Sequence, residues 1–364
     1  MDRVKRAFSW LREHAHPNIV LPVLVGAGLL AYVASLASAP KNAAALWATI
    51  KQVWWLVLLL TFPYLVARLY VWNALMRELG VRVPFRQALL AFAGGEMTKS
   101  LPGGIYVENY LLKRLTHMDE KRTVRSSAAT TAILGLEATL ALLVVLVAGI
   151  PGVPWVRWGL LVVVGVWLLL IAGLRWLIHL GAERSADLPG WLAHVRRDAA
   201  EFLKDGRALL RWRTLLNLGP TALYMFIYAV DLHFISAALG LPRLGWVAVV
   251  TVYAAMVLAV VLVPIPTEIG IAEISVLGAL AGFGVEHHQA AVVALALRIL
   301  ATGATILVSG IVFLALRGEL READQEAAAG AGDDRADTER GDAGDDLAPT
   351  HGERERRAHD QAPD

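Results

Sequence analysis

The chain has 364 residues, of which 57% are hydrophobic, and its mean hydropathy of +0.53 excludes an ordinary soluble domain and predicts a polytopic membrane protein. A formal net charge of +2 is too small to indicate nucleic-acid binding, so the basic residues are interpreted as topology signals. The absence of cysteine excludes disulfides, thiolate chemistry and thiolate metal sites.

Several stretches are apolar enough and long enough to cross a bilayer as helices, for which about 20 residues suffice. No convincing small-residue cleavage site follows the first of them, so we expect a retained helix and not a signal peptide. Two further apolar stretches, 87–112 and 271–285, are interrupted or too short for a simple crossing. In chain order the predicted spans cover residues 19–37, 46–70, 124–150, 155–177, 215–239, 244–263 and 290–316.

Two similar breaks interrupt this hydrophobic sequence, at residues 97–108 and 263–273. Each places Pro, Gly and ionisable residues between apolar stretches, and irregular chain survives in a bilayer only where it lines a cavity. Paired breaks in corresponding halves of a chain are typical of transporter sites. The residues that break the helices are Pro102, Gly103 and Gly104 in the first segment and Pro264, Pro266 and Gly270 in the second.

The basic residues predict how the chain is oriented, because Lys and Arg gather in cytoplasmic loops. The short connections 38–45, 151–154 and 240–243 carry few charges and are expected to be external. Both termini are expected to be cytoplasmic. The basic clusters lie before the first span, at 77–86, 113–125 and 184–213, and at Arg317 and Arg321.

The first break is therefore flanked by cytoplasmic residues and the second by external ones. This arrangement predicts an all-α transmembrane helix bundle with two re-entrant, broken helical elements that belong to an inverted repeat. An alternative keeps residues 244–263 as a full crossing and makes 271–285 a short return span, and the distribution of charges does not decide between the two.

Ionisable residues inside apolar stretches mark functional sites or buried partners, because each costs ~2.5 to 3.5 kcal/mol on insertion scales. Glu108 and Glu273 lie on the half-helices that follow the two breaks and are the first candidates. One interpretation is that they pair with a cationic head group or take up a proton during transport. The other is a capping or interhelical hydrogen bond, and both stay open.

The half-helix amino termini at the breaks favour anions, so a lipid phosphate is the expected ligand there. Lys99 and Thr98 or Thr267 would add contacts to it. The alternative for Lys99 is that it snorkels to the cytoplasmic interface.

Arg298 lies inside the last apolar stretch and is predicted either to bind phosphate or to pair with Glu273 or Glu268. Asp231 and Glu137 are further candidates within their helices. Arg68, in contrast, lies near the cytoplasmic end of its helix and is expected to snorkel. By helical spacing the residues that share a face with these candidates are Thr302, Thr305 and Ser309 for Arg298, Tyr224 and Tyr228 for Asp231, and Thr130 for Glu137.

Three short motifs resemble the transmembrane-region family of lysylphosphatidylglycerol synthases. They are Pro264–Glu273, then Phe283–Val285, then Ala296–Arg298, where that family has a Pro-Gly-Gly-x-Gly-x-x-Glu pattern, a Phe-Gly and a helix that bears Arg. The first break, Leu101–Gly104, also resembles an upstream Leu-Pro-Gly element, and Glu137 lies where members often carry Glu. The resemblance covers most of residues 15–318.

The chain departs from the family pattern at several of these positions. Thr267 and Glu268 replace the usual Gly-Gly, and Tyr106 stands where Gly is typical. The Arg expected after the first break is missing, and Ala138 replaces the Arg that follows the intramembrane Glu. These changes leave the predicted fold intact but alter the charges where a head group would be recognised.

The predicted organisation is a cytoplasmic segment 1–18, a transmembrane flippase-like domain 19–318 and a disordered cytoplasmic tail 319–364, which is too polar to fold. Residues 183–213 suit an amphipathic helix on the inner leaflet, or an ordinary linker helix. No segment is expected to hold the soluble synthase that some family members carry.

What the resemblance implies is a flippase or permease for a phospholipid or other amphipathic lipid, in a bacterial inner membrane. No catalytic signature is present, so we expect no enzyme, no cofactor and no metal site. Two alternatives stay open: an intramembrane lipid-modifying enzyme that uses Glu108, Glu273 and Arg298, and an accessory subunit of a lipid-synthesis enzyme that transports nothing.

Overall fold

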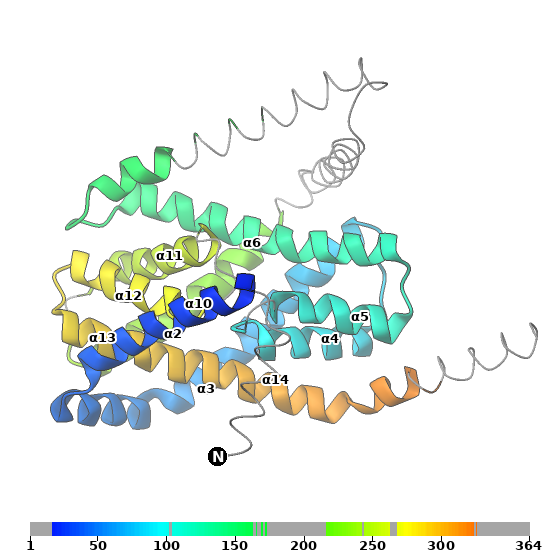
Figure 1. Ribbon diagram of the computed structural model, residues 1–364, viewed down its shortest axis with the longest axis horizontal. Coiled ribbons are helices and arrows are strands. Elements are labelled where there is room, and N and C mark those ends of the chain that lie inside the picture. Colours follow the sequence, from blue (N-terminus) through cyan, green and yellow to red (C-terminus); the bar gives the residue numbers. More distant parts are fainter. Residues whose placement is uncertain are drawn as a thin grey trace, which may run out of the picture. The chain divides into compact units, whose positions relative to one another are not determined.

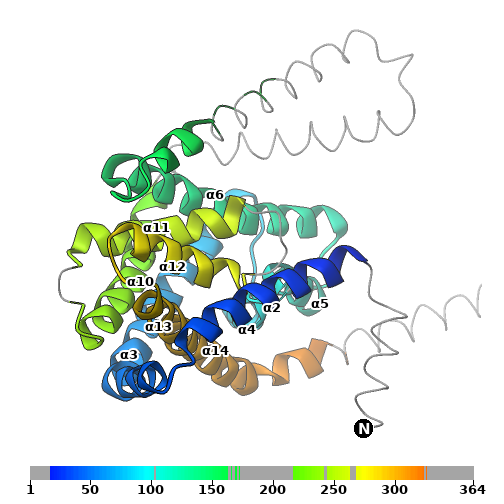
Figure 2. The same ribbon diagram turned by 60° about the vertical axis from the view of Figure 1, so that its left-hand side comes forward.

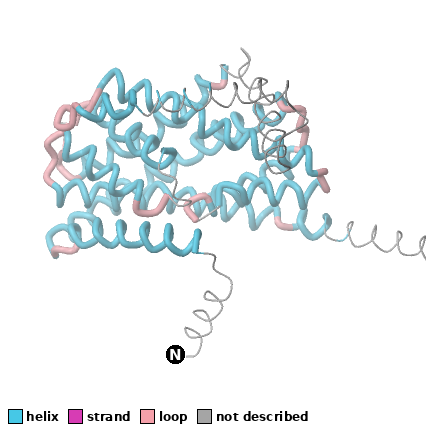
Figure 3. Tube along the Cα trace, turned by 45° about the horizontal axis from the view of Figure 1, so that its top comes forward, coloured by secondary structure: helices cyan, strands magenta, loops and turns pink. Residues whose placement is uncertain are grey.

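The computed structural model describes residues 17–101, 104–162, 216–241, 244–262 and 268–323, and the single residues 165, 169, 172 and 325. Within these residues the chain is helical and has no strand, which confirms the predicted all-α class (Figure 3). Two units divide the chain, 1–316 and 317–364, and the helices discussed below belong to the first. The predicted segments that lie wholly or largely outside the described residues are 1–18, 183–213 and 319–364.

The described residues of the first half of the bundle form helices and a 3-10 turn (Figure 1). The long helix α3 begins at Pro40, because the N–H that proline lacks has no partner in the first turn of a helix. Asp119 caps the amino terminus of α6, because its side chain accepts a 2.9 Å hydrogen bond from the Arg122 N–H. The elements are α2 (Pro17–Ala37), α3 (Pro40–Glu78), α4 (Phe85–Thr98), η1 (Gly104–Tyr106), α5 (Val107–Thr116) and α6 (Glu120–Ala148).

The second half ends in a continuous helical run that changes type midway. Between α13 and α14 lies a π-helical turn, in which hydrogen bonds join residues five apart instead of four. The sequence did not predict this turn. The elements are α10 (Leu218–Ala238), α11 (Trp246–Leu262), α12 (Ile271–Gly282), α13 (His287–Leu297), η2 (Arg298–Thr302) and α14 (Gly303–Leu316).

Within the part of the chain that the structure describes, four helical segments are long and apolar enough to cross a membrane. The helices beside the breaks are shorter, and the 14 residues of α4 and 12 of α12 rise only ~21 and ~18 Å, against a hydrocarbon core of ~30 Å. Large apolar side chains are exposed along the long helices, among them Val66 and Val147 at 67% and 81%. Such a surface suits lipid and not water. The four segments are Pro40–Glu78, Glu120–Ala148, Leu218–Ala238 and His287–Leu316.

The helices that flank each break pack against each other, α4 on α5 and α11 on α12 (Figures 1 and 2). Glycine permits the first contact, because a Cβ at Gly95 would collide with the Glu108 side chain. At the second break Gly270 has φ +85°, and a Cβ there would collide with the Gly26 carbonyl of α2. Two of the closest approaches around the breaks therefore depend on residues without a side chain.

Candidate functional site

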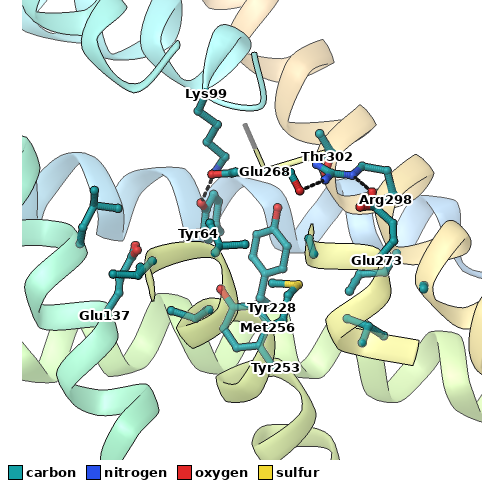
Figure 4. A pocket seen from close by; sticks show the side chains of 18 of the residues that line it. Tyr64, Lys99, Glu137, Tyr228, Tyr253, Met256, Glu268, Glu273, Arg298 and Thr302 are labelled. Carbon is teal, nitrogen blue, oxygen red and sulfur yellow. Dashed lines mark hydrogen bonds and ion pairs between the residues drawn. The ribbon is translucent and has the colours of Figure 1, made fainter. Parts of the chain in front are cut away.

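A cavity of about 100 Å³ lies between the two broken segments (Figure 4). This volume exceeds the ~10–15 Å³ that one water needs. One wall is apolar and comes from α11, with Met256, Val257, Val260 and Val261. The ionisable and hydroxyl side chains that line the cavity are Tyr64, Arg68, Lys99, Glu137, Tyr228, Tyr253, Glu268, Glu273, Arg298 and Thr302.

Arg298 joins both broken segments at one end of the cavity. Its Nε pairs with Glu273 Oε1, and its Nη2 donates a 3.0 Å hydrogen bond to the Glu268 carbonyl. Its Nη1 donates a 3.2 Å hydrogen bond to Ser100 Oγ in the first break. Arg298 begins the π-helical turn, and such turns are frequent at functional sites.

Glu273 is held on both carboxylate oxygens. While Oε1 pairs with Arg298, Oε2 accepts a 2.7 Å hydrogen bond from the Gly270 N–H, so that Glu273 closes a capping box at the start of α12. Its side chain is only 1% exposed. Glu273 therefore makes the capping and interhelical contacts of the second interpretation, and it also lines the cavity.

A second cluster of charges lies toward α3, α4 and α6. Arg68 Nε binds Glu96 Oε1 at 2.7 Å, and its Nη1 pairs with Glu137 Oε1. Lys99 Nζ binds the second oxygen of Glu96 at 2.9 Å and donates a 2.8 Å hydrogen bond to the Tyr64 hydroxyl. Figure 4 shows Lys99 reaching toward Tyr64. The interfacial placements expected for Arg68 and considered for Lys99 are thus corrected, because buried carboxylates bind both cations.

Glu137 is a cavity residue and receives a second contact, a 2.8 Å hydrogen bond donated by the Tyr224 hydroxyl. Tyr224 is fully buried, and the Arg68 guanidinium lies 5.7 Å from the centre of its ring. Glu137 is therefore held by Arg68 and by the Tyr224 hydroxyl, while the ring of Tyr224 contacts the guanidinium of Arg68.

Glu108 is buried in a separate polar network and is not among the residues that line the cavity. Its carboxylate accepts a hydrogen bond from Thr130 Oγ1 on α6. Asn109 and Ser126 extend the network, and Trp72 Nε1 donates to Thr130 at 3.3 Å. The structure thus brings Glu273, Glu268, Glu137, Lys99 and Arg298 to one cavity, while Glu108 lies in the packing between α5 and α6.

Asp231 is also absent from the cavity lining, although it is buried at 3% exposure. Its Oδ1 has no hydrogen-bond partner among the described residues. Of the residues predicted to break the helices, Gly104 and Gly270 are described. Those that lie outside the described residues are Pro102, Gly103, Pro264 and Pro266, together with Thr267.

Glu96 and Tyr64 were not predicted, although both bind Lys99. A signal for Glu96 was present, since an acidic residue in an apolar stretch is costly unless it is paired, and Lys99 follows three residues later. No comparable signal marks Tyr64. Among the described residues no group of three or more His, Asp or Glu could hold a metal ion.

Comparison with protein families gives a match over most of the chain. The family described as lysylphosphatidylglycerol synthase TM region matches residues 19–310, a range that includes both breaks and the whole cavity lining. Comparisons with curated proteins and with solved structures each gave no match.

Proposed function

Because the chain belongs to the lysylphosphatidylglycerol synthase TM region family, we propose that this membrane protein moves a phospholipid or a lipid-linked molecule between leaflets through the cavity. The observation that carries the proposal is a charged cavity enclosed by helices whose outer surfaces are apolar. Ionisable residues inside a membrane are expensive and line substrate pathways or bind one another. Here they do both.

The cations of the cavity keep donors that a phosphate can use. A guanidinium has five N–H donors, and the three hydrogen bonds of Arg298 leave two of them without a partner among the described residues. Lys99 has three donors, of which Tyr64 and Glu96 take two. Phosphate is the lipid group that binds best to such a pair, as charge-assisted hydrogen bonds are the strong ones.

We propose further that the broken segments are re-entrant and related by an inverted repeat. The packing supports this, because helices in equivalent positions make equivalent contacts. The first long helices of the halves, α3 and α10, pack on each other. In addition α4 packs on α14 of the other half, and α11 packs on α6. These reciprocal contacts are those expected of a two-fold axis between the halves.

Cysteine labelling tests this topology in a chain that has no native cysteine. Exposed probes are placed at Arg82, before α4, and at Lys113, in the last turn of α5. Probes at Gly245 and Glu286 flank α11 and α12. We expect an impermeant thiol reagent to label the first pair only from the cytoplasmic side and the second only from outside. Labelling of one pair from opposite sides would contradict re-entrant elements.

A further cysteine probe at Leu262, the last residue of α11, distinguishes a re-entrant α11 from one that crosses the membrane completely. A full crossing brings the end of α11 to the cytoplasmic surface, where the reagent reacts. A re-entrant α11 keeps residue 262 within the bilayer, so its labelling is expected to stay at the level of a cysteine-free control. The same labelling pattern reports whether the basic clusters and both termini are cytoplasmic, as we propose for an inner-membrane protein.

Reconstitution of the full chain into vesicles tests transport. With a phospholipid labelled on its acyl chain, we expect leaflet exchange about tenfold or more above that of protein-free vesicles, equivalent to ~1.4 kcal/mol of barrier. Heat-denatured protein is the control. Mass spectrometry of the recovered lipid distinguishes the alternatives, because an intramembrane enzyme changes the lipid's mass. Unchanged mass without faster exchange would exclude both activities and favour an accessory subunit.

A further inference from the structure

Glu108 is a buried carboxyl group without a cationic partner. It is 7% exposed and lies on α5, which packs on α4 and α6. Among the described residues its polar contact is the hydrogen bond that Thr130 donates to Oε1, while Oε2 lies next to Gly95 of α4. By contrast, Glu96 binds two cations, and Glu273 binds one cation and a backbone N–H. One hydroxyl donor does not replace the water that a charged carboxylate loses on burial.

The hydrogen bonds of Thr130 determine where a proton on Glu108 must lie. A hydroxyl group has one proton and two acceptor lone pairs. Trp72 Nε1 and Asn109 Nδ2 donate to Thr130 Oγ1 at 3.3 and 3.2 Å, so both lone pairs are in use. The single proton of Thr130 is donated to its nearest acceptor, Glu108 Oε1. Oε1 therefore only accepts, and a proton on this carboxyl group is bound to Oε2.

The charged groups around Glu108 do not neutralise it. Those that act on it electrostatically are Arg68 of α3 and Glu96 and Lys99 of α4. Both cations bind Glu96, whose own negative charge opposes theirs, and neither forms an ion pair with Glu108. The side chains of α6 in this network are uncharged hydroxyls, and the ionisable side chain of η1, Tyr106, is 51% exposed. A neutral carboxylic acid is therefore the form that fits this site.

We propose that Glu108 is a proton-binding site, which holds its proton on Oε2 while α5 is packed on α4 and α6 and releases it to water when α5 moves away. On release the O–H bond breaks, its electron pair stays on Oε2, and a water molecule takes the proton. The charged carboxylate then opposes repacking of α5, because one neutral hydrogen bond does not offset its burial. The inference goes beyond lipid transport and does not depend on it. It makes the first broken segment sensitive to pH.

Unfolding of the full chain in mixed micelles at several pH values tests proton binding. An unfolded glutamic acid loses its proton above about pH 4.3, whereas packed Glu108 keeps it, so the folded state binds one proton more. The folding equilibrium constant then falls as pH rises, by up to about tenfold per pH unit. Divided by the constant of Glu108→Gln, which has no proton to release, the wild-type constant should fall about 10- to 100-fold between about pH 5 and about pH 7.

The matched control for this measurement is Glu120→Gln, at an exposed position on α6. An exposed carboxyl group releases its proton at nearly the same pH in the folded and unfolded states, so the quotient of wild type and control should stay nearly constant over this range. A quotient for Glu108→Gln that is equally constant would overturn the proposal.

Infrared spectroscopy detects the proton itself, because a protonated carboxyl group has a C=O stretching band separate from the bands of a carboxylate. We expect Glu108→Gln to remove such a band from the wild-type spectrum near neutral pH. Thr130→Val should shift the band to higher frequency, since it removes the hydrogen bond to Oε1, and it provides a second variant in case Glu108→Gln does not fold. A spectrum that neither variant changes in this region would contradict a protonated Glu108.

Thiol labelling tests whether release of the proton frees α5. Leu112 is fully buried on this helix, and the neighbouring Lys113 is exposed. We expect the labelling rate of Leu112→Cys, divided by that of Lys113→Cys, to rise with pH by up to about tenfold per unit. The division removes the pH dependence of the thiol group. In the Glu108→Gln background the quotient should stay constant, and an equal rise in both backgrounds would show that Glu108 does not control the packing of α5.

Discussion

Arg298→Met is expected to lower the free energy of unfolding by about 3–5 kcal/mol and to reduce leaflet exchange to the level of protein-free vesicles. The variant removes the partner of Glu273, which is 1% exposed and would remain as an unpaired buried charge. It also removes the hydrogen bonds to Ser100 and to the Glu268 carbonyl, which connect the two broken segments. Equilibrium unfolding in mixed micelles and the vesicle assay measure the two effects.

A double variant distinguishes loss of folding from loss of binding. Glu273→Gln removes the orphaned charge while its amide oxygen can still accept the Gly270 N–H. In combination with Arg298→Met it should therefore recover about half or more of the lost stability, because most of the cost of a broken buried pair comes from the unpaired charge. Leaflet exchange should stay at background. Recovery of exchange together with stability would show that Arg298 does not bind the substrate.

Arg68→Met is the second variant for which we expect a large effect, a loss of about 3–5 kcal/mol of stability. Arg68 connects Glu96 of α4 with Glu137 of α6, and neither carboxylate has more than 10% of its side chain exposed. Among the described residues, Glu96 would then keep only Lys99 as a partner, and Glu137 only the Tyr224 hydroxyl. The negative charges of Glu96 and Glu137 would then repel each other, which favours separation of α4 and α6.

The same helix provides a matched control for this variant. Arg77→Met removes an exposed guanidinium from the last turn of α3, and surface substitutions of this kind change stability by about 0.5 kcal/mol or less. Adding Glu137→Gln to Arg68→Met should restore part of the stability, since glutamine can accept the Tyr224 hydrogen bond. Equal effects of Arg68→Met and Arg77→Met on unfolding would show that the buried ion pairs contribute little.

The positions of several apolar helices were predictable, because a run of apolar residues is visible in the sequence itself. Residues 215–239 and 244–263 were predicted, and the helices run over 218–238 and 246–262. The long helix α3 was underestimated, since 46–70 was predicted and it covers 40–78. Its ends carry charged residues that can remain helical beyond the hydrocarbon, where hydropathy no longer marks the helix.

The partners of the charged residues were harder to predict, because they depend on how helices distant in sequence pack together. For Arg298 two alternatives were predicted, phosphate binding or an ion pair with Glu273 or Glu268. The structure contains the ion pair with Glu273. The ion pairs of Arg68 with Glu96, 28 positions later, and with Glu137 could not be predicted, because pairing between helices leaves no periodic signal in the sequence. Position along its helix suggested an interfacial Arg68, but a buried carboxylate on each side outweighs snorkelling.

The π-helical turn at Arg298–Thr302 changes which side chains of the last helical run share a face. A turn that closes over five residues holds one residue more than an α-turn, so side chains after it are rotated by about 100° from the continuation of α13. A helical wheel drawn through residues 287–316 with a single period would therefore assign wrong faces on one side of the turn. The two parts of the run contact different helices besides α3, which both of them contact: α13 contacts α12 and α2, whereas α14 contacts α4. A residue inserted or deleted here would exchange one contact face for another while preserving every hydrophobic residue.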